Sequence, residues 1–187
     1  MNYNEYKEVI LNTPVSEGLE YNIAVAWVHP QEIPLRVVSR NGCTDKVIHI
    51  PETALNRWGL ERPVMGIGKL AFKDCTDITD IILGSYVEIL GSGAFSGCTA
   101  LERIVIPKGL RRINKEAFAG CTALSDIYYG GTPEEWERIT IHLEKHEYEY
   151  GELIPGTPVQ KLTGERIIRI PGNEALKLAN IHFHCIL

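Results

Sequence analysis

The chain has 187 residues, 44% of them hydrophobic and 23% charged, which gives enough apolar material for one folded domain and argues against disorder. The net charge of −5 at pH 7 disfavours a generic binder of nucleic acid or of anionic membranes, because either would need a basic face. No stretch approaches the roughly 18 consecutive apolar residues that a membrane span requires.

Residues 1–19 form an N-terminal segment without the basic n-region and the long apolar h-region of an export signal. The chain as written is therefore expected in the cytoplasm. A trimmed form of a longer precursor would instead be compatible with the cell surface.

Residues 20–63 are predicted to cap the N-terminal end of a repeat array. Tyr21–Trp27 and Leu35–Ser39 have the composition of two strands, and His29–Gln31 lies between them, which predicts a hairpin. The next apolar stretch, Val47–Pro51, matches the strand position of the repeats that follow, so it is predicted as a degenerate first coil. The remaining residues of this cap are predicted as a loop with a helical turn.

Residues 64–132 consist of three rows of 23 residues. Five columns are identical in all three rows, and several others stay aliphatic. The identical columns are Ala71/Ala94/Ala117, Phe72/Phe95/Phe118, Cys75/Cys98/Cys121, Thr76/Thr99/Thr122 and Ile81/Ile104/Ile127. A period of 23 lies within the range of about 20–29 that is typical of leucine-rich repeats, so the rows predict a leucine-rich-repeat solenoid of stacked coils.

Each row predicts one short strand and one helical turn. Leu101, Ile104 and Ile106 alternate with variable residues as in a half-buried strand, which Pro107 ends. The stretch Ser92–Phe95 is predicted as a helical turn that carries its phenylalanine inward. A single coil cannot enclose its own apolar side chains, so the coils are expected to stack with parallel strands and ladders of equal residues.

Residues 133–187 are predicted to close the solenoid with an α/β cap. Thr132 begins a helix as its N-cap, with proline at the first turn and an acid three residues on. A second helix is predicted over 172–179 and a strand over 181–185. Residues 143–171 interrupt this pattern and are predicted as an inserted arm with a hairpin, packed on the solenoid flank or on another copy.

The second row runs Leu90-Gly91-Ser92-Gly93-Ala94-Phe95-Ser96-Gly97-Cys98 and continues with Leu101, Ile104, Ile106 and Pro107. This row resembles the unit of the BspA-like leucine-rich repeat family, and the closing segment resembles the C-terminal cap of that family. The resemblance implies a parallel-sheet solenoid. In the family at large it also implies proteins that adhere to or recognise other macromolecules.

The five cysteines do not suggest a disulfide framework, because their number is odd and no export signal precedes them. Cys75, Cys98 and Cys121 are 23 residues apart, whereas zinc ligands usually occur in pairs two to four residues apart. Buried structural thiols explain this ladder better than a metal does.

Four histidines leave a surface zinc site open as a minor hypothesis, since His182 and His184 share a strand face and His142 and His146 would share a helix face. The alternative is ordinary exposed histidines. The sequence contains neither a Gly-x-Ser-x-Gly elbow nor a His-Glu-x-x-His motif, and Gly66-x-Gly68 lacks the third glycine of a phosphate loop. No catalytic residue, cofactor or metal is therefore predicted.

Outward positions of the predicted strands form the candidate binding face. This face consists of His49, Ile82, Val105, Tyr128, His182, Asp80, Arg103 and Asp126. The first five side chains are expected to form one apolar and aromatic line, and the last three a line of alternating charge. Contiguous exposed apolar groups often mark a binding surface, and aromatic anchors are typical of hot spots. The alternative is that β-branched residues merely suit strands and that the charges form a minor cross-strand ladder.

The sequence thus predicts a non-catalytic module that recognises an unidentified protein partner through its exposed strand face or its inserted arm. A structural self-assembly protein, in which the arm or edge strands pair between copies, is the alternative. Neither nucleic-acid binding nor membrane insertion is predicted, and weak homo-oligomers are compatible with both hypotheses.

Overall fold

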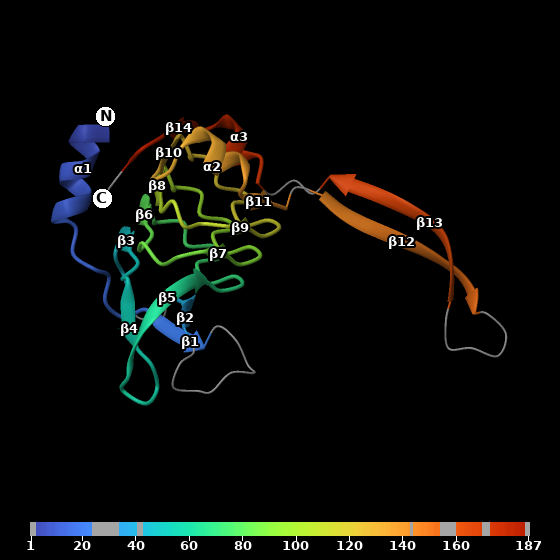
Figure 1. Cartoon of the computed structure of the whole chain (residues 1–187), viewed down its shortest axis with the longest axis horizontal. Coiled ribbons are helices and arrows are strands. Elements are labelled where there is room, and N and C mark those ends of the chain that lie inside the picture. The colour runs from blue at the N-terminus through green and yellow to red at the C-terminus, as the bar shows by residue number, and fades with distance from the viewer. Residues whose placement is uncertain are drawn as a thin grey trace.

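The computed structural model describes residues 3–23, 34–40, 43–142, 144–153, 160–169 and 173–185. Two sheets lie on opposite sides of an apolar core, and a long hairpin projects from one end of the solenoid (Figure 1). The chain alternates between the two sheets as it winds, which is the parallel-sheet solenoid that the repeats predicted.

The large sheet has the strand order β1-β2-β5-β7-β9-β11, and β4 pairs with β5 at one side. Its strands are β1 (Glu20–Ile23), β2 (Leu35–Ser39), β4 (Thr53–Leu55), β5 (Glu61–Ile67), β7 (Ile89–Leu90), β9 (Arg112–Ile113) and β11 (Thr140–Ile141). From β2 to β11 along the main order all pairs are parallel.

The small sheet has the strand order β14-β10-β8-β6-β3 and is parallel throughout. Its strands are β3 (Val47–His49), β6 (Asp80–Ile82), β8 (Arg103–Ile106), β10 (Asp126–Tyr129) and β14 (Asn180–His182). Asp80 pairs with Arg103, and Arg103 pairs with Asp126, so neighbouring strands are offset by one row of 23 residues. Equal columns of the sequence therefore stack directly above one another.

Three phenylalanines form the centre of the core. Phe72, Phe95 and Phe118 stack with ring centroids 5.5 and 5.4 Å apart, and none is more than 1% exposed. Full burial of one such side chain stabilises the fold by roughly 1.5–3 kcal/mol. Because each ring packs on the rings of the neighbouring coils, this stabilisation exists only in the stacked array.

The corner between the two sheets is a series of tight turns. The prediction of a helical turn at Ser92–Phe95 is wrong, because two columns of each coil adopt a left-handed backbone that interrupts helical dihedral angles. The first column has φ values of +59°, +62° and +59° at Leu70, Gly93 and Glu116, and the second has +59°, +79° and +73° at Asp74, Gly97 and Gly120.

The N-terminal cap differs from its prediction in one element. Strands β1 and β2 pair antiparallel as the predicted hairpin requires, while 24–33, including His29–Gln31, lie outside the described residues. The predicted loop after β3 is instead an antiparallel pair of β4 and β5. Asn56 forms its turn, since its side-chain Oδ1 accepts hydrogen bonds from the backbone amides of Trp58 and Leu60 at 3.0 Å each. The local hydrogen bonds of this asparagine outweigh the weak helical signal.

The C-terminal cap begins with α2 (Pro133–Glu137), which has the predicted N-cap at Thr132. The Thr132 side chain accepts from the Glu135 amide, and the Glu135 carboxylate accepts from the Thr132 amide, which completes a capping box. After the arm, α3 (Ala175–Leu178) is shorter than the predicted second helix. Its predicted start at Gly172 lies outside the described residues.

Asn173 takes the place of a further coil at the end of the array. The amides of Phe72 and Phe95 each donate to the alanine carbonyl of the next coil at 2.8 Å. Phe118 has no next coil, and its amide donates to the side-chain Oδ1 of Asn173 at 3.2 Å. The Asn173 Nδ2 donates to the carbonyls of Asn114 and His142, so this 1% exposed amide is fully paired.

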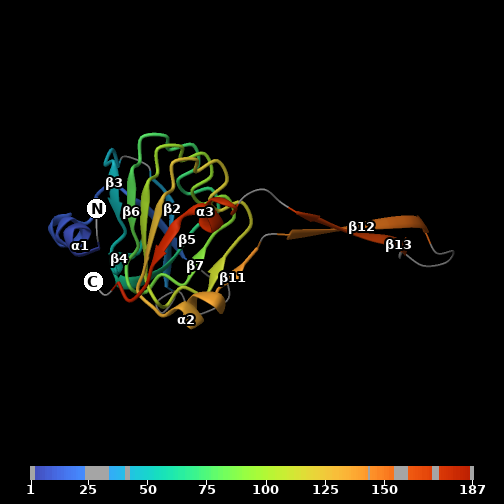
Figure 2. The same cartoon turned by 90° about the horizontal axis from the view of Figure 1, so that it is seen from above.

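The arm is a hairpin of β12 (Glu144–Leu153) and β13 (Gln160–Arg169). It pairs with neither the large nor the small sheet, and both views show it pointing away from the solenoid (Figure 2). The predicted hairpin is present, and of the two packing surfaces expected for it the solenoid flank is not used, while packing on another copy stays a prediction. The turn expected at 154–158 lies outside the described residues.

Candidate functional site

The predicted binding face has the expected register in the small sheet. His49 pairs with Ile82, Ile82 with Val105, Val105 with Tyr128, and Tyr128 with His182. The line of side chains that the sequence predicted on the outer face of this sheet is therefore continuous from β3 to β14.

The apolar part of this line is nevertheless not exposed. Ile82, Val105 and Tyr128 are each 1% exposed, and they form a second apolar cluster with Ile10 and Cys185. Ile10 belongs to the N-terminal helix α1 (Tyr3–Asn12), which lies against the outer face of the small sheet (Figures 1 and 2). The expectation of an exposed strand face is wrong here, because the chain covers that face with its own first helix.

The charged line of the predicted face consists of internal pairs. Arg103 makes a bidentate pair with Asp80 at 2.5 and 3.0 Å, and the Asp80 side chain is only 4% exposed. Asp126 accepts from His182 at 2.8 Å, and the His182 ring stacks on Tyr128 with centroids 4.7 Å apart. Burial alone would raise the pKa of Asp126, but hydrogen bonds from His182 and Ser125 outweigh it, so the pKa lies below its ordinary value. These contacts tie neighbouring strands together.

The histidines whose side chains are described do not converge on a metal site. His142 follows β11 in the large sheet, while His182 lies in β14 of the small sheet and is bound to Asp126. Within the ranges that the structure describes, no three histidine, cysteine or acidic side chains are grouped as metal ligands would be. The side chain of His146 is outside the described atoms.

The cysteine ladder is buried in two of its three rungs. Cys98 and Cys121 are at most 2% exposed, and their thiols donate to the carbonyls of Phe72 and Phe95 at 3.1 Å. Burial raises the pKa of both thiols to about 12. Cys75, in the first row, is only partly buried, and its thiol lies 3.9 Å from the Lys73 carbonyl. A nucleophilic role does not fit thiols that stay protonated and enclosed.

The outer face of the large sheet is open where that of the small sheet is covered. One outward row crosses five strands and consists of Arg36, Gly66, Ile89, Arg112 and Thr140, which are paired in register. Ile89 is 43% exposed at the centre of this row. This row differs from the covered row of Ile82, Val105 and Tyr128 in the small sheet, because it carries an exposed β-branched side chain between two arginines.

Two hollows flank Ile89 on this face. The first has a volume of about 390 Å³ and lies over β2, β5 and β7, between Arg36, Met65 and Lys69. The second has a volume of about 700 Å³ and lies over β7, β9 and β11, next to α2. Ile89 and Glu88 line both hollows, so the two hollows are neighbours on the large sheet, and we call them together the outer groove.

The outer groove is basic although the chain as a whole is acidic. It is lined by six cationic side chains, Arg36, Lys69, Lys108, Arg111, Arg112 and Arg138, and by two carboxylates, Glu88 and Glu135. Glu88 faces Arg111 at 3.6 Å, and Glu135 is engaged in the capping box of α2. Within the described part of the chain, Arg36, Lys69, Lys108 and Arg112 have no ion-pair partner. The groove therefore has an excess of positive charge in a protein of net charge −5.

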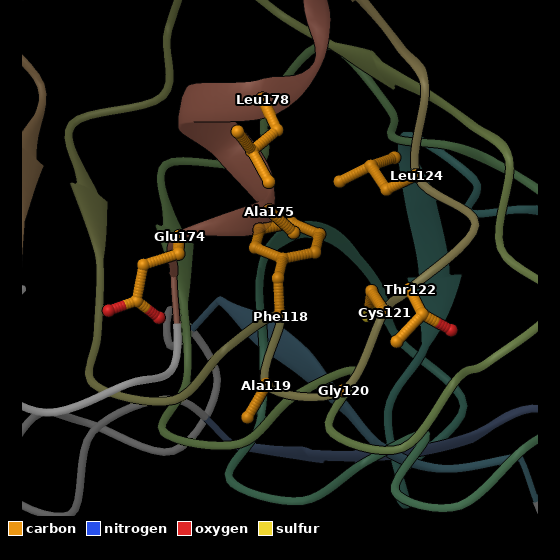
Figure 3. Close-up of a pocket in the computed structure, with 9 residues that line it drawn as sticks. All are labelled: Phe118, Ala119, Gly120, Cys121, Thr122, Leu124, Glu174, Ala175 and Leu178. Carbon is orange, nitrogen blue, oxygen red and sulfur yellow. The ribbon is translucent and has the colours of Figure 1, made fainter.

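A smaller apolar pocket lies at the C-terminal end of the core. It has a volume of about 350 Å³ and is enclosed by the last coil and by α3, with Phe118, Leu124, Ala175 and Leu178 around it (Figure 3). Phe118 is the last ring of the ladder, and Ala175 of α3 lies beside it in this pocket. Leu178 is 85% exposed at the rim.

The sequence contained a signal for the helix α1, which was missed, but none for the outer groove. Tyr3, Tyr6, Val9 and Ile10 recur at helical spacing, which is typical of an amphipathic helix such as α1. The outer groove depends on residues outside the identical columns of the three rows, and Arg36 lies before the first row. Its basic character appears only when Arg36 and Arg112 are brought onto one face by the winding of the chain.

Residues 51–140 match the model of the BspA type leucine rich repeat region, in 6 copies. No curated protein sequence matches the chain. Similar solved structures include leucine-rich repeat proteins from T. pallidum, Bacteroides capillosus and Bacteroides ovatus. The T. pallidum protein is 28% identical over 64% of this chain and 53% of its own, with a TM-score of 0.44. The B. capillosus protein is 25% identical over 58% of this chain and 87% of its own, with a TM-score of 0.47. The B. ovatus protein is 26% identical over 64% of this chain and 32% of its own, with a TM-score of 0.49. The match thus spans about half the length of the T. pallidum protein. Of the helices that the structure describes, none has the length and apolarity needed to cross a bilayer.

Proposed function

Because residues 51–140 are a BspA-type leucine-rich repeat region, we propose that this protein is a non-catalytic recognition module that binds a protein partner in the outer groove. Leucine-rich repeats generally mediate protein–protein recognition. In the repeats the inward side chains of the strands form the core, while the outward side chains differ from row to row.

One observation supports this choice of surface. The outward row of the small sheet is closed by α1, whereas the outward row of the large sheet carries Ile89 at 43% exposure between two hollows. A partly exposed aliphatic side chain with hollows on both sides can become a buried contact when a partner docks. Asp80 and Arg103 on the small sheet already pair with each other, so their charges are less available to a binding partner.

Site-specific photo-cross-linking tests this proposal. A photoreactive amino acid at position 89 should give a saturable protein adduct in a lysate of the native cell, and excess unlabelled protein should compete for it. The same amino acid at position 105, which is buried under α1, should give none. An adduct at Val105 that exceeds the adduct at Ile89 would place recognition on the small sheet instead, and the proposal for the outer groove would fail.

Self-assembly through the arm is a second candidate function. The observation in its favour is that β12 and β13 pair only with each other among the described strands and point away from the solenoid. An isolated two-stranded hairpin is marginally stable in water, so pairing with another copy would stabilise it. Light scattering should then show a dimer or larger species that becomes a monomer when residues 143–171 are replaced by a short Gly/Ser linker.

A further inference from the structure

We infer that the outer groove recognises an extended acidic peptide segment in which two carboxylates flank an aliphatic residue. This inference rests on the proposed function and adds the chemistry of the partner. It follows from the charge of the groove, from the position of its apolar surface and from the spacing of the strands beneath it.

The charge of the groove defines the first requirement. Arg36 and Arg112 are exposed at two points of the outward row, and neither has an ion-pair partner among the described residues. Lys69 and Lys108 add cations at the margins of the two hollows. Oppositely charged surfaces steer association and set specificity, so a partner with carboxylates is favoured over a neutral or basic one.

The apolar surface between the arginines defines the second requirement. Gly66 lies between Arg36 and Ile89 in the row and has no side chain, and a Cβ built on it would lie 3.9 Å from the Cβ atoms of both neighbours, so the row has a gap at this position beside the first hollow. Met65 and Ile89 line the two sides of this opening. A single aliphatic side chain placed above Gly66 would contact both, and burying it would add to the electrostatic attraction.

The strand spacing gives the register of the peptide. Neighbouring strands are about 4.8 Å apart, so Arg36 and Arg112, three strands apart, are separated by about 14 Å. In an extended peptide, residues i, i+2 and i+4 point to the same side, and i and i+4 are about 13 Å apart. Carboxylates at i and i+4 therefore reach the two arginines, while the residue at i+2 lies above Gly66 beside Ile89.

A nucleic acid fits the same groove less well. Glu88 and Glu135 lie within it and would repel a continuous chain of phosphates, whereas a peptide presents its carboxylates at separate points. Base recognition on a single strand usually needs exposed aromatic rings for stacking. The aromatic residue that lines the groove, Tyr129, is only 1% exposed.

Fluorescence anisotropy with synthetic peptides tests the inference on the full chain. The probe carries glutamate at i and i+4 and isoleucine at i+2 in a Gly/Ser context. Three comparison probes are a peptide with the two glutamates adjacent, a peptide with lysine in place of glutamate, and a single-stranded oligonucleotide. The first probe is expected to bind at least about five-fold more tightly than each of the others, and its affinity should fall as salt rises.

Charge reversals identify the contacts. Arg36→Glu and Arg112→Glu should each weaken binding of the first probe by at least about five-fold, and both together by more. Lys46→Glu makes the same change of net charge next to β3 in the small sheet and should alter the affinity less than two-fold. Circular dichroism of each variant controls for folding, which exposed substitutions rarely disturb.

The inference is overturned if the oligonucleotide or the lysine peptide binds as tightly as the first probe. It is equally overturned if the arginine reversals leave the affinity unchanged, or if no acidic peptide binds at millimolar concentration. A protein adduct at position 89 in the cross-linking experiment, found together with any of these results, would retain the proposed function and reject only this class of partner.

Discussion

Ser16 and His49 exchange two hydrogen bonds at the edge of the small sheet. The Ser16 amide donates to the His49 carbonyl at 3.0 Å, and the His49 amide donates to the Ser16 hydroxyl at 3.0 Å. The Nδ1–H of His49 also donates to the Thr13 carbonyl at 3.0 Å. These bonds hold the segment after α1 against β3 and satisfy part of an otherwise unpaired strand edge. They also position Ile10 over the buried row of Ile82, Val105 and Tyr128.

Removal of residues 1–12 should therefore expose Ile82, Val105 and Tyr128 without unfolding the repeats. Loss of the Ile10 contact alone should lower the free energy of unfolding by about 1.5–3 kcal/mol. Binding of a hydrophobic dye to the native protein should rise, because a contiguous apolar stripe becomes accessible. A truncated chain with unchanged dye binding and unchanged stability would show that α1 does not cover this face in solution.

Truncation of the central ring should be costly in comparison with a change in the outer groove. Phe95→Ala removes a 0% exposed ring with neighbours on both sides and should cost roughly 3–5 kcal/mol by leaving a cavity. Ile89→Ala, at a 43% exposed position, should cost about 1 kcal/mol or less. Urea denaturation of both variants measures the difference. Equal losses would mean that the inward and outward faces are assigned the wrong way round.

The two buried thiols should make the fold sensitive to alkaline pH. Burial raises the pKa of Cys98 and Cys121 from 9.0 to about 12, so the folded chain keeps these protons where the unfolded chain releases them. The stability from this difference is present below pH 9 and is lost as the pH rises from about 9 to about 12.

Urea unfolding at pH 8, 9 and 10 measures this loss. The variant with Cys98→Ala and Cys121→Ala serves as the control, because it should show a smaller decrease above pH 9 than the natural chain. Identical decreases in both proteins would mean that these thiols do not contribute to the pH dependence. Thiol reagents should also label Cys98 and Cys121 slowly before unfolding and quickly after it.

Substitutions to or from glycine at the left-handed positions of the corner should change the free energy of unfolding. Glu116 has a φ of +59° and is exposed, so Glu116→Gly should raise the free energy of unfolding by up to about 1 kcal/mol by relieving backbone strain. Gly93, in the same column, has a φ of +62°, and a Cβ there would lie 2.6 Å from the side chain of Leu70. Gly93→Ala should thus destabilise the protein. If both substitutions had the same sign of effect, backbone conformation would not be the dominant cause.

The arm should be dispensable for the repeats. Its strands pair only with each other among the described elements, and Asn173 Nδ2 lies 3.1 Å from the His142 carbonyl, so the two ends of the insertion meet. Replacing 143–171 by a short Gly/Ser linker should leave cooperative unfolding intact and reduce stability by at most a few kcal/mol. Loss of the cooperative transition would show that the arm is part of the folded core.

Much of the solenoid could be predicted from the sequence because its information is periodic. The identical columns specified the strands, the phenylalanine ladder and the register that links His49 to His182, and each of these is present. The capping box at Thr132 was predicted from four adjacent residues. Local chemistry and repetition were sufficient for these features.

The parts that could not be predicted depend on contacts between distant residues. Tyr128 packs in one cluster with Ile10, which lies more than 100 positions earlier, and with Cys185, and both of these residues lie outside the repeats. The outer groove likewise depends on Arg36 and Arg112 meeting on one face, although neither belongs to a repeated column. The turn at Asn56 was mistaken because its side-chain hydrogen bonds imitate a backbone turn that composition does not reveal.

Asn173 also bears on how proteins of this kind change length. The end of the array is closed by a side-chain amide that binds one backbone N–H and two carbonyls of the last winding, and none of these bonds depends on side chains of the coils. Duplication or loss of a whole row upstream would present the same three backbone groups to the same amide. Gain and loss of rows by recombination can therefore proceed without a matching change in the terminus, so that evolution can vary the extent of the outer groove while the closing segment stays the same.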